Sequence, residues 1–228
     1  MVFFFVALTV AVFIAIDVLL RREEQKIKNV EHLKKSPIFL NPEQALNKVG
    51  DEMKRLFHLS HTWVLPSDEG YLYVGLDNFM TTIFTSEIQI DDLPLIGTHV
   101  PQGTKIWNIK SGIRHIKQLA PVSGQVVDVN PAFGMDVPLP SNQIEKSWIL
   151  KIKPDKLKDE SNNLMNYKQA HMINTALKDE FYIYAQRGHY LNDGGQFDAE
   201  YLKNMSNGDW LELLQRFFPY HDNFINGG

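Results

Sequence analysis

The sequence predicts an α+β protein with one N-terminal transmembrane helix, a compact β barrel or sandwich domain and a helical C-terminal extension. Three observations favour this class. The first twenty residues are almost wholly apolar, short apolar runs cut by Gly, Pro, Asp and Asn fill the middle of the chain, and helical periodicity returns after Pro154. With 228 residues, 44% of them hydrophobic and 22% charged, the chain is long enough for one or two globular domains.

The apolar run Val2–Leu20 has the length of a membrane-spanning helix. As an α-helix it would reach roughly 29 Å, about one hydrocarbon thickness, and Asp17 is its only ionisable residue. No basic segment precedes the run and no small-residue cleavage pattern follows it, which disfavours a cleaved signal peptide. We therefore expect residues 1–20 to form a retained transmembrane helix. Asp17 is either a boundary acid, a contact with a partner helix or part of a proton relay.

Basic residues follow this run directly and none precedes it: Arg21, Arg22, Lys26, Lys28, Lys34 and Lys35. The positive-inside rule then predicts a single-pass protein of the cytoplasmic membrane, with its N-terminus outside and its C-terminal domain in the cytoplasm. Residues 21–40 are expected to be a charged stalk or linker. The formal net charge of −4 offers no basic excess for nucleic acid, and the absence of cysteine excludes disulfides and Cys-ligated metals.

Residues 41–157 are expected to form a β domain with a leading helix. Asn41-Pro42 combines an N-cap residue with proline at the first helical position, so a helix is predicted from there to about Phe57. The five apolar runs that predict strands are Tyr71–Val74, Ile88–Ile90, Lys105–Ile109, Gly124–Val129 and Trp148–Ile152.

Residues 158–228 are expected to form a helical extension. Ala170, Ile173, Leu177 and Phe181 recur at helical spacing, and Asp209 signals a second helix with Trp210 and Phe217 on one apolar stripe. Such stripes are typical of packing faces, and these two aromatic residues are candidate contacts. The extension would either cap the β domain or reach a neighbouring subunit.

A series of short motifs runs through the middle of the chain: His61-Thr62-Trp63-Val64, Val74-Gly75-Leu76, Leu93-Pro94, Gly97-Thr98-His99-Val100, Ala120-Pro121-Val122-Ser123-Gly124, Val126–Asn130 and Trp148–Ile152. In order and spacing these motifs resemble the H protein of the glycine cleavage system, a relative of the biotinyl and lipoyl carrier domains. The resemblance covers roughly residues 61–156 and implies the lipoyl-type β-barrel-sandwich fold.

The resemblance also implies a lysine at the tip of a β-hairpin that carries lipoyl as an amide. In the family this lysine stands seven residues before the alanine of the A-P-[VI]-S-G motif, and here that position is Ile113. Isoleucine has no nucleophile, so we expect no lipoyl or biotin cofactor. Lys110 and Lys117 are the nearby amines, but side chains alternate along a strand and a shift in register moves an amine off the tip.

The predicted hairpin tip is basic. No acid lies between Leu93 and Val127, whereas Lys105, Lys110, Arg114 and Lys117 all do. Such a loop would meet anionic headgroups or an acidic face of a neighbouring subunit, or it is an ordinary solvated loop.

No constellation of catalytic or metal-ligating residues is found, and the neighbouring His58 and His61 are expected to be structural. We therefore expect no enzyme and no metal. The favoured hypothesis is a membrane-anchored accessory subunit that docks on and stabilises a larger membrane complex, respiratory or photosynthetic. Its partners would be other membrane subunits and lipids, with no nucleic acid. Two alternatives remain: a lipoyl-type carrier for a membrane redox enzyme that uses Lys110 or Lys117, and a scaffold that recruits soluble enzymes.

Overall fold

The computed structural model describes residues 52–85, 87–133, 138–140, 144–145, 147–198 and 201–220. A seven-stranded antiparallel sheet has the strand order β11-β1-β2-β3-β10-β8-β5. Its strands are β1 (Leu56–His58), β2 (Thr62–Pro66), β3 (Leu72–Leu76), β5 (His99–Val100), β8 (Gly124–Val129), β10 (Trp148–Pro154) and β11 (Met165–Asn166).

A four-stranded antiparallel sheet has the order β7-β6-β4-β9. Its strands are β4 (Glu87–Asp91), β6 (Lys105–Ser111), β7 (Arg114–Leu119) and β9 (Leu139–Pro140). The longest pairing joins β6 and β7 as a hairpin, with Ile109 opposite Ile116 and Ser111 opposite Arg114. The alternation of buried and exposed side chains along β7 sends Arg114 and Ile116 to the inner face and His115 to the outer face.

Glycine is required where β3 passes over a tryptophan. A Cβ atom at Gly75 would lie 2.3 Å from Cζ2 of Trp63, which is fully buried on the neighbouring strand β2. The indole Nε1 of Trp63 donates a hydrogen bond of 2.6 Å to the carbonyl of Leu76. The Val-Gly-Leu sequence of β3 thus makes room for the tryptophan of the His-Thr-Trp-Val segment.

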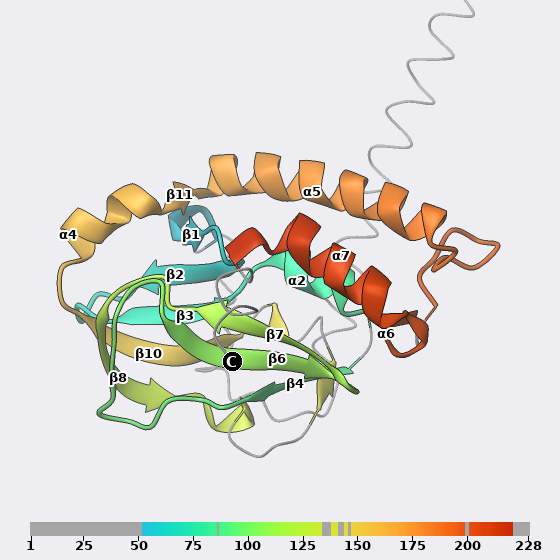
Figure 1. Ribbon diagram of the computed structural model, residues 1–228. Helices are drawn as coiled ribbons and strands as arrows, with labels where there is room; N and C mark the ends of the chain where they lie inside the picture. Colours follow the sequence, from blue (N-terminus) through green and yellow to red (C-terminus); the bar gives the residue numbers. More distant parts are fainter. Residues whose placement is uncertain are drawn as a thin grey trace, which may run out of the picture. The chain divides into compact units, whose positions relative to one another are not determined.

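Helices cover the sheets, and Figure 1 shows the long α5 running across one side of the molecule with α7 beside it. The helices are η1 (Glu52–Lys54), α2 (Asn78–Ile83), η2 (Pro131–Phe133), α4 (Leu157–Glu160), η3 (Ser161–Asn163), α5 (Tyr167–Arg187), α6 (Tyr201–Asn204) and α7 (Asn207–Phe217). A reciprocal capping box between Asn166 and Gln169 starts α5, and the side chain of Ser206 accepts from the Asp209 N–H to start α7.

The C-terminal helices share one hydrophobic core with the strands. Phe181 of α5 and Phe217 of α7 are buried in the same cluster as Phe79 of α2 and the inner faces of both sheets. The ring centroids of Phe79 and Phe217 lie 6.0 Å apart, and those of Phe181 and Phe217 lie 5.4 Å apart with an edge-on geometry. The extension therefore caps the β domain, the first of the two arrangements expected for it.

The five predicted strands all occur, with ends that differ by up to two residues. The predicted helix from Asn41 is wrong at its end, because Leu56 and Phe57 lie in β1 and pair with β2. The start of that helix, the transmembrane helix 1–20 and the stalk 21–40 lie outside the described residues. Among the helices that are described, none combines the length and the hydropathy that a bilayer crossing needs.

Candidate functional site

The candidate site is the apex of the β6–β7 hairpin, which is a two-residue turn of Gly112 and Ile113. Gly112 has φ of +58°, a backbone conformation that glycine adopts without strain, and glycine is preferred at the first central position of a type II′ turn. The side chain of Ile113 is 75% exposed. The aliphatic residue that the sequence aligns with the carrier position thus stands in solvent at the hairpin apex.

The next residue, Arg114, points inward and binds the C-terminal extension. Its Nη1 donates to Oδ1 of Asn207 at 2.9 Å and its Nε donates to the carbonyl of Leu202 at 3.3 Å. Its Nη2 donates to the carbonyl of Met205, and its guanidinium lies 5.4 Å from the ring centroid of Trp210. The expectation that Arg114 is an exposed interaction residue is therefore wrong, because the side chain is buried and its donors serve carbonyls of the same chain.

The other basic residues of the predicted tip do not form one surface. Lys105 lies at the base of the hairpin, opposite Leu119, and forms an ion pair with Asp92. Lys110 is exposed near the apex and Lys117 is half-buried on β7. The structure thus separates the four residues: Lys110 is exposed near the apex, Arg114 is buried beside the turn, Lys117 lies midway along the hairpin opposite Asn108, and Lys105 lies at the far end.

Trp210 and Phe217, the aromatic contact candidates of the extension, serve the interior of this chain. Phe217 is 2% exposed in the shared core, which contradicts a role in binding a partner directly. Trp210 is half-buried beside Arg114. Asp17 lies outside the described residues.

We expect Arg114→Ala to lower the free energy of unfolding by about 2 to 3 kcal/mol, because hydrogen bonds to charged groups carry that order of stability when buried. Arg114→Lys should lose most of the same stability, because an ammonium group cannot reproduce the planar fork of donors. Urea denaturation gives the change, and amide hydrogen exchange of residues 201–210 should speed up in both variants. Unchanged exchange there would contradict the role assigned to Arg114.

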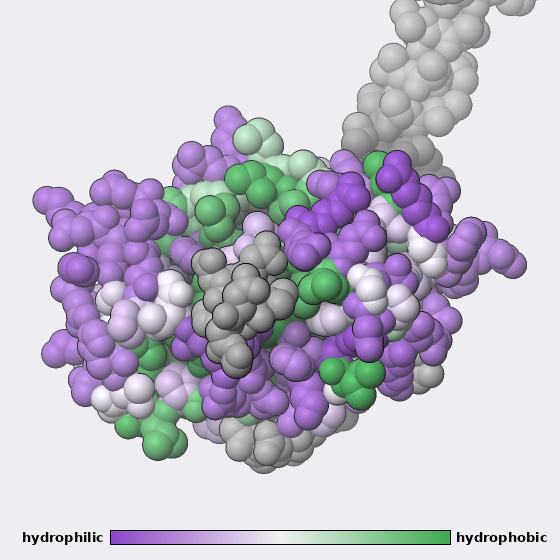
Figure 2. Space-filling view, in the orientation of Figure 1, coloured by the Kyte–Doolittle hydropathy of each residue, from purple (hydrophilic) through white to green (hydrophobic). Residues whose placement is uncertain are grey.

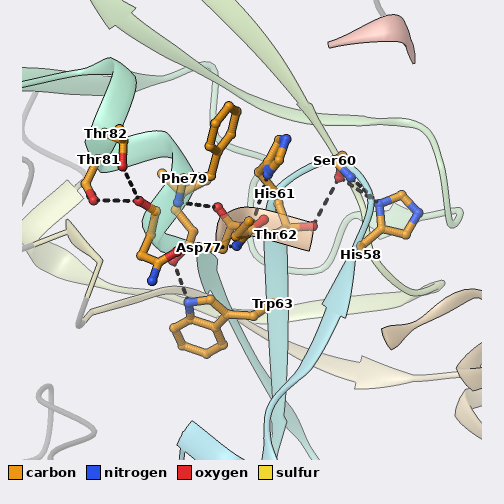
Figure 3. Close-up of polar contacts among 12 residues, drawn as sticks. His58, Ser60, His61, Thr62, Trp63, Asp77, Phe79, Thr81 and Thr82 are labelled. Carbon is orange, nitrogen blue, oxygen red and sulfur yellow. Dashed lines mark hydrogen bonds and ion pairs between the residues drawn. The ribbon is translucent and has the colours of Figure 1, made fainter. Parts of the chain in front are cut away.

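A buried polar cluster joins the β1–β2 turn, α2 and α5, and Figure 3 shows its His61, Asp77 and Phe79. His61 Nδ1 donates to Oδ2 of Asp77 at 3.0 Å, and Asn174 of α5 donates to the same oxygen at 2.9 Å. The N–H of Phe79 donates to Oδ1 of Asp77 at 3.0 Å, so this carboxylate is also the N-cap of α2. Burial alone would raise the pKa of Asp77, but His61 and these hydrogen bonds hold it below its ordinary value of 3.8.

His61 has a φ of +61°, and its ring lies 4.6 Å from that of Phe79 and 5.5 Å from that of Phe218 in the extension. Left-handed backbone is uncommon outside glycine, and here the bond to Asp77 and the aromatic neighbours fix the side chain. His61 therefore has a structural role, in a cluster that joins the β domain to the extension.

The imidazole of His58 is expected to make stability depend on pH. Burial, and then the neighbouring His61, lower the pKa of His58 below 6.5. Its Nδ1 also accepts the N–H of Ser60 at 3.2 Å, an acceptor role that protonation removes. Because the unfolded chain binds this proton more readily, the contribution of His58 to the free energy of unfolding is fully present above pH 6.5 and falls as the pH drops below that value. Urea midpoints of wild type and His58→Gln from pH 7.5 to 5 test this: the decline should be smaller in the variant, and equal slopes would contradict it.

Glu160 is a buried contact that the sequence did not indicate. Its carboxylate accepts from the N–H of Ser123 at 2.7 Å and from the hydroxyl of Ser123 at 2.6 Å. Ser123 belongs to the Ala-Pro-Val-Ser-Gly segment, so α4 stabilises that turn. The only available signal was an acid in a polar stretch after Pro154, which does not specify a partner 37 residues away.

A small pocket of about 60 Å³ lies between α5 and the end of the seven-stranded sheet. It is lined by polar and aromatic side chains that include Arg55, Trp63, Asp77, His171 and Asn174. The Asp77 and Asn174 side chains are bonded to each other, and the Arg55 guanidinium lies 4.1 Å over the Trp63 ring. Within the described ranges, no three His, Asp or Glu side chains are grouped as a metal site would need.

Comparisons with known proteins place the β domain among relatives. A sequence model of the family described as "Glycine cleavage H-protein" matches residues 55–177. The chain is 30% identical over 106 residues to a probable glycine cleavage system H protein of Thermococcus kodakarensis, covering 46% of this chain and 78% of that protein. It is 31% identical over 109 residues to the corresponding protein of Pyrococcus furiosus, covering 47% of this chain and 80% of that one.

A crystal structure of a glycine cleavage system H protein from Mycobacterium marinum is similar with a TM-score of 0.46 and 20% identity, covering 54% of this chain and 98% of that one. The matched residues end within α5, so α6 and α7 lie outside the part shared with the family.

Proposed function

The chain belongs to the glycine cleavage H-protein family, and we propose that it is a non-catalytic accessory subunit, anchored in the cytoplasmic membrane, that docks on a larger membrane complex. The resemblance implies that family members carry lipoyl groups and are not enzymes themselves, which agrees with a non-enzymatic role. The β domain would act as a docking module and would no longer act as a carrier.

The observation that carries the proposal is the exposed aliphatic side chain of Ile113 at the hairpin apex. Attachment of lipoate as an amide requires a primary amine at that point. Lys110 lies on β6 before the apex and Lys117 is half-buried on β7, so neither takes the place of the apex residue. The hairpin is retained with its inner face packed in the core, which supports a role for the fold without the carrier chemistry.

Membrane anchoring is supported by the sequence before the described residues. The run Val2–Leu20 is long and apolar enough for a span, and six basic residues follow it within the next fifteen. The partners would be integral subunits of a complex, and respiratory and photosynthetic assemblies are suggested as hosts by association only.

Intact-mass spectrometry of the chain purified from its native membranes tests the loss of the carrier role. The expected result is the mass of the unmodified sequence. A lipoyl adduct mapped by peptide fragmentation to Lys110 or Lys117 would instead support the carrier alternative.

The anchoring and docking roles are tested by membrane extraction. We expect the full chain to resist alkaline carbonate, and a variant that lacks residues 2–20 to be released with the soluble proteins. Purification of the full chain in mild detergent should bring along integral membrane proteins as stoichiometric partners. Recovery of soluble enzymes in their place would favour the scaffold alternative.

A further inference from the structure

The Ile113 side chain at the hairpin apex is not required by the turn. Gly112 supplies the unusual backbone conformation, and the second central position of such a turn accepts polar residues as readily as apolar ones. Burial does not explain it either, because three quarters of the side chain is exposed. Ile113 is thus an exposed aliphatic side chain that neither the turn nor the core requires, and it is available for contact with a surface outside the molecule.

The apex is also held in a fixed position. Arg114, the residue after Ile113, is bonded to Leu202, Met205 and Asn207 of the extension. On the other side of the turn, the Cγ of Lys203 would lie 3.6 Å from a Cβ built at Gly112. A side chain presented on a fixed support loses less conformational entropy when it binds.

The ionisable side chains around the apex are mostly basic. Lys110 and His115 are exposed on the two strands of the hairpin, and the Lys203 side chain approaches from α6. On the adjoining strand β4, the exposed acid Glu87 lies two residues before Gln89, which pairs with Lys110. An apolar apex with amines beside it matches the layering of an anionic membrane surface, where acyl chains lie beneath phosphate groups.

We infer that the β6–β7 apex touches the anionic inner leaflet, with Ile113 entering the interface and Lys110 meeting the headgroups. The inference rests on the proposed membrane anchor, because one aliphatic side chain and one or two amines bind a bilayer weakly on their own. A tether in the same membrane raises the effective concentration to the order of millimolar, which makes a weak contact sufficient.

A protein partner at the apex is less well supported than a lipid surface. A stable protein interface buries about 1,000 Å² or more in one contiguous area. The exposed large apolar residues of the described chain are instead spread over different elements: Met53 in η1, Leu59 in the β1–β2 turn, Leu95 and Ile96 before β5, Ile113 at the apex, Met172, Tyr182 and Ile183 on α5, and Leu211 on α7. On the face drawn in Figure 2, apolar surface is likewise divided into separate areas.

Because the natural chain has no cysteine, Ile113→Cys provides a single labelling site. The full-length variant is labelled with a polarity-sensitive fluorophore and reconstituted into vesicles of phosphatidylcholine with or without phosphatidylglycerol. In the anionic vesicles the emission should shift to the blue and be quenched by brominated lipid. The matched label at Leu95→Cys, a site that is 79% exposed in another loop, should show neither effect.

The charge contribution is tested on the labelled Ile113→Cys chain. Adding Lys110→Glu should reduce the quenching, and adding Lys168→Glu, which reverses an exposed lysine of α5, should leave it unchanged. If the chain floats with the vesicles but the label at position 113 is not quenched, the apex inference is overturned and the anchor stands. If the chain does not float, both fail. Quenching that requires native membrane proteins would assign the apex to a protein partner and overturn the lipid contact.

Discussion

Replacing Asp77 by alanine is expected to lower the free energy of unfolding by about 3 to 5 kcal/mol, the range for removing one partner of a buried pair. The carboxylate is 4% exposed and accepts hydrogen bonds from His61, Asn174 and the N–H of Phe79. Its loss leaves three donors in the interior without this acceptor and removes the N-cap of α2. Urea denaturation followed by tryptophan fluorescence measures the change.

Asp155→Ala is the matched control for this prediction. Asp155 also contacts a histidine, with 2.6 Å between His99 Nε2 and its Oδ2, but both side chains are about half exposed. An exposed pair contributes about 0 to 1 kcal/mol, so this variant should unfold close to the wild type. Equal losses of unfolding free energy in the two variants would contradict the larger contribution assigned to the buried Asp77 cluster.

The second large effect is expected for Phe217→Ala in α7, at about 3 to 5 kcal/mol for removing a buried aromatic side chain. The ring of Phe217 packs against Phe79, Phe181 and Tyr184. Its loss opens a cavity where α7 meets α2 and α5. The urea midpoint should fall while the slope of the transition stays the same, if domain and extension unfold together.

Leu211→Ala tests the same helix without the cavity. Leu211 is 41% exposed on α7, so its truncation removes little buried surface and should cost well under half as much. A biphasic transition in Phe217→Ala would contradict the shared core, because it would mean that the extension unfolds separately from the strands.

The strands and the hairpin apex could be predicted from sequence because their signals are local. Alternating apolar runs separated by glycine and proline mark β3, β6, β8 and β10. The spacing of the motifs aligns Ile113 with the position of the carrier lysine in the family. The structure then places that residue in the two-residue turn of β6 and β7. The helical spacing of the tail likewise predicts the packing face of α7 and part of that of α5, where Ala170 and Phe181 are buried but Ile173 is not.

The role of Arg114 could not be predicted because its partners lie 88 to 93 residues further along the chain. A run of basic residues suggests an exposed patch, although the alternation along β7 puts Arg114 on the same face as Ile116 and so carried a partial signal. The leading helix failed at Leu56 and Phe57 for a related reason. Both fit a helical stripe, but pairing with β2 and β11 decides their conformation.

The family match ends at residue 177, yet α5 continues without interruption from Tyr167 to Arg187. The end of the family match therefore falls in the middle of a helix and not in a linker. Truncation of the chain at residue 177 would divide this helix and remove Phe181 and Tyr184, which belong to the hydrophobic core. The segment after residue 177 thus begins inside α5 without a break, and Phe181 and Tyr184 pack it into the same core as the matched part.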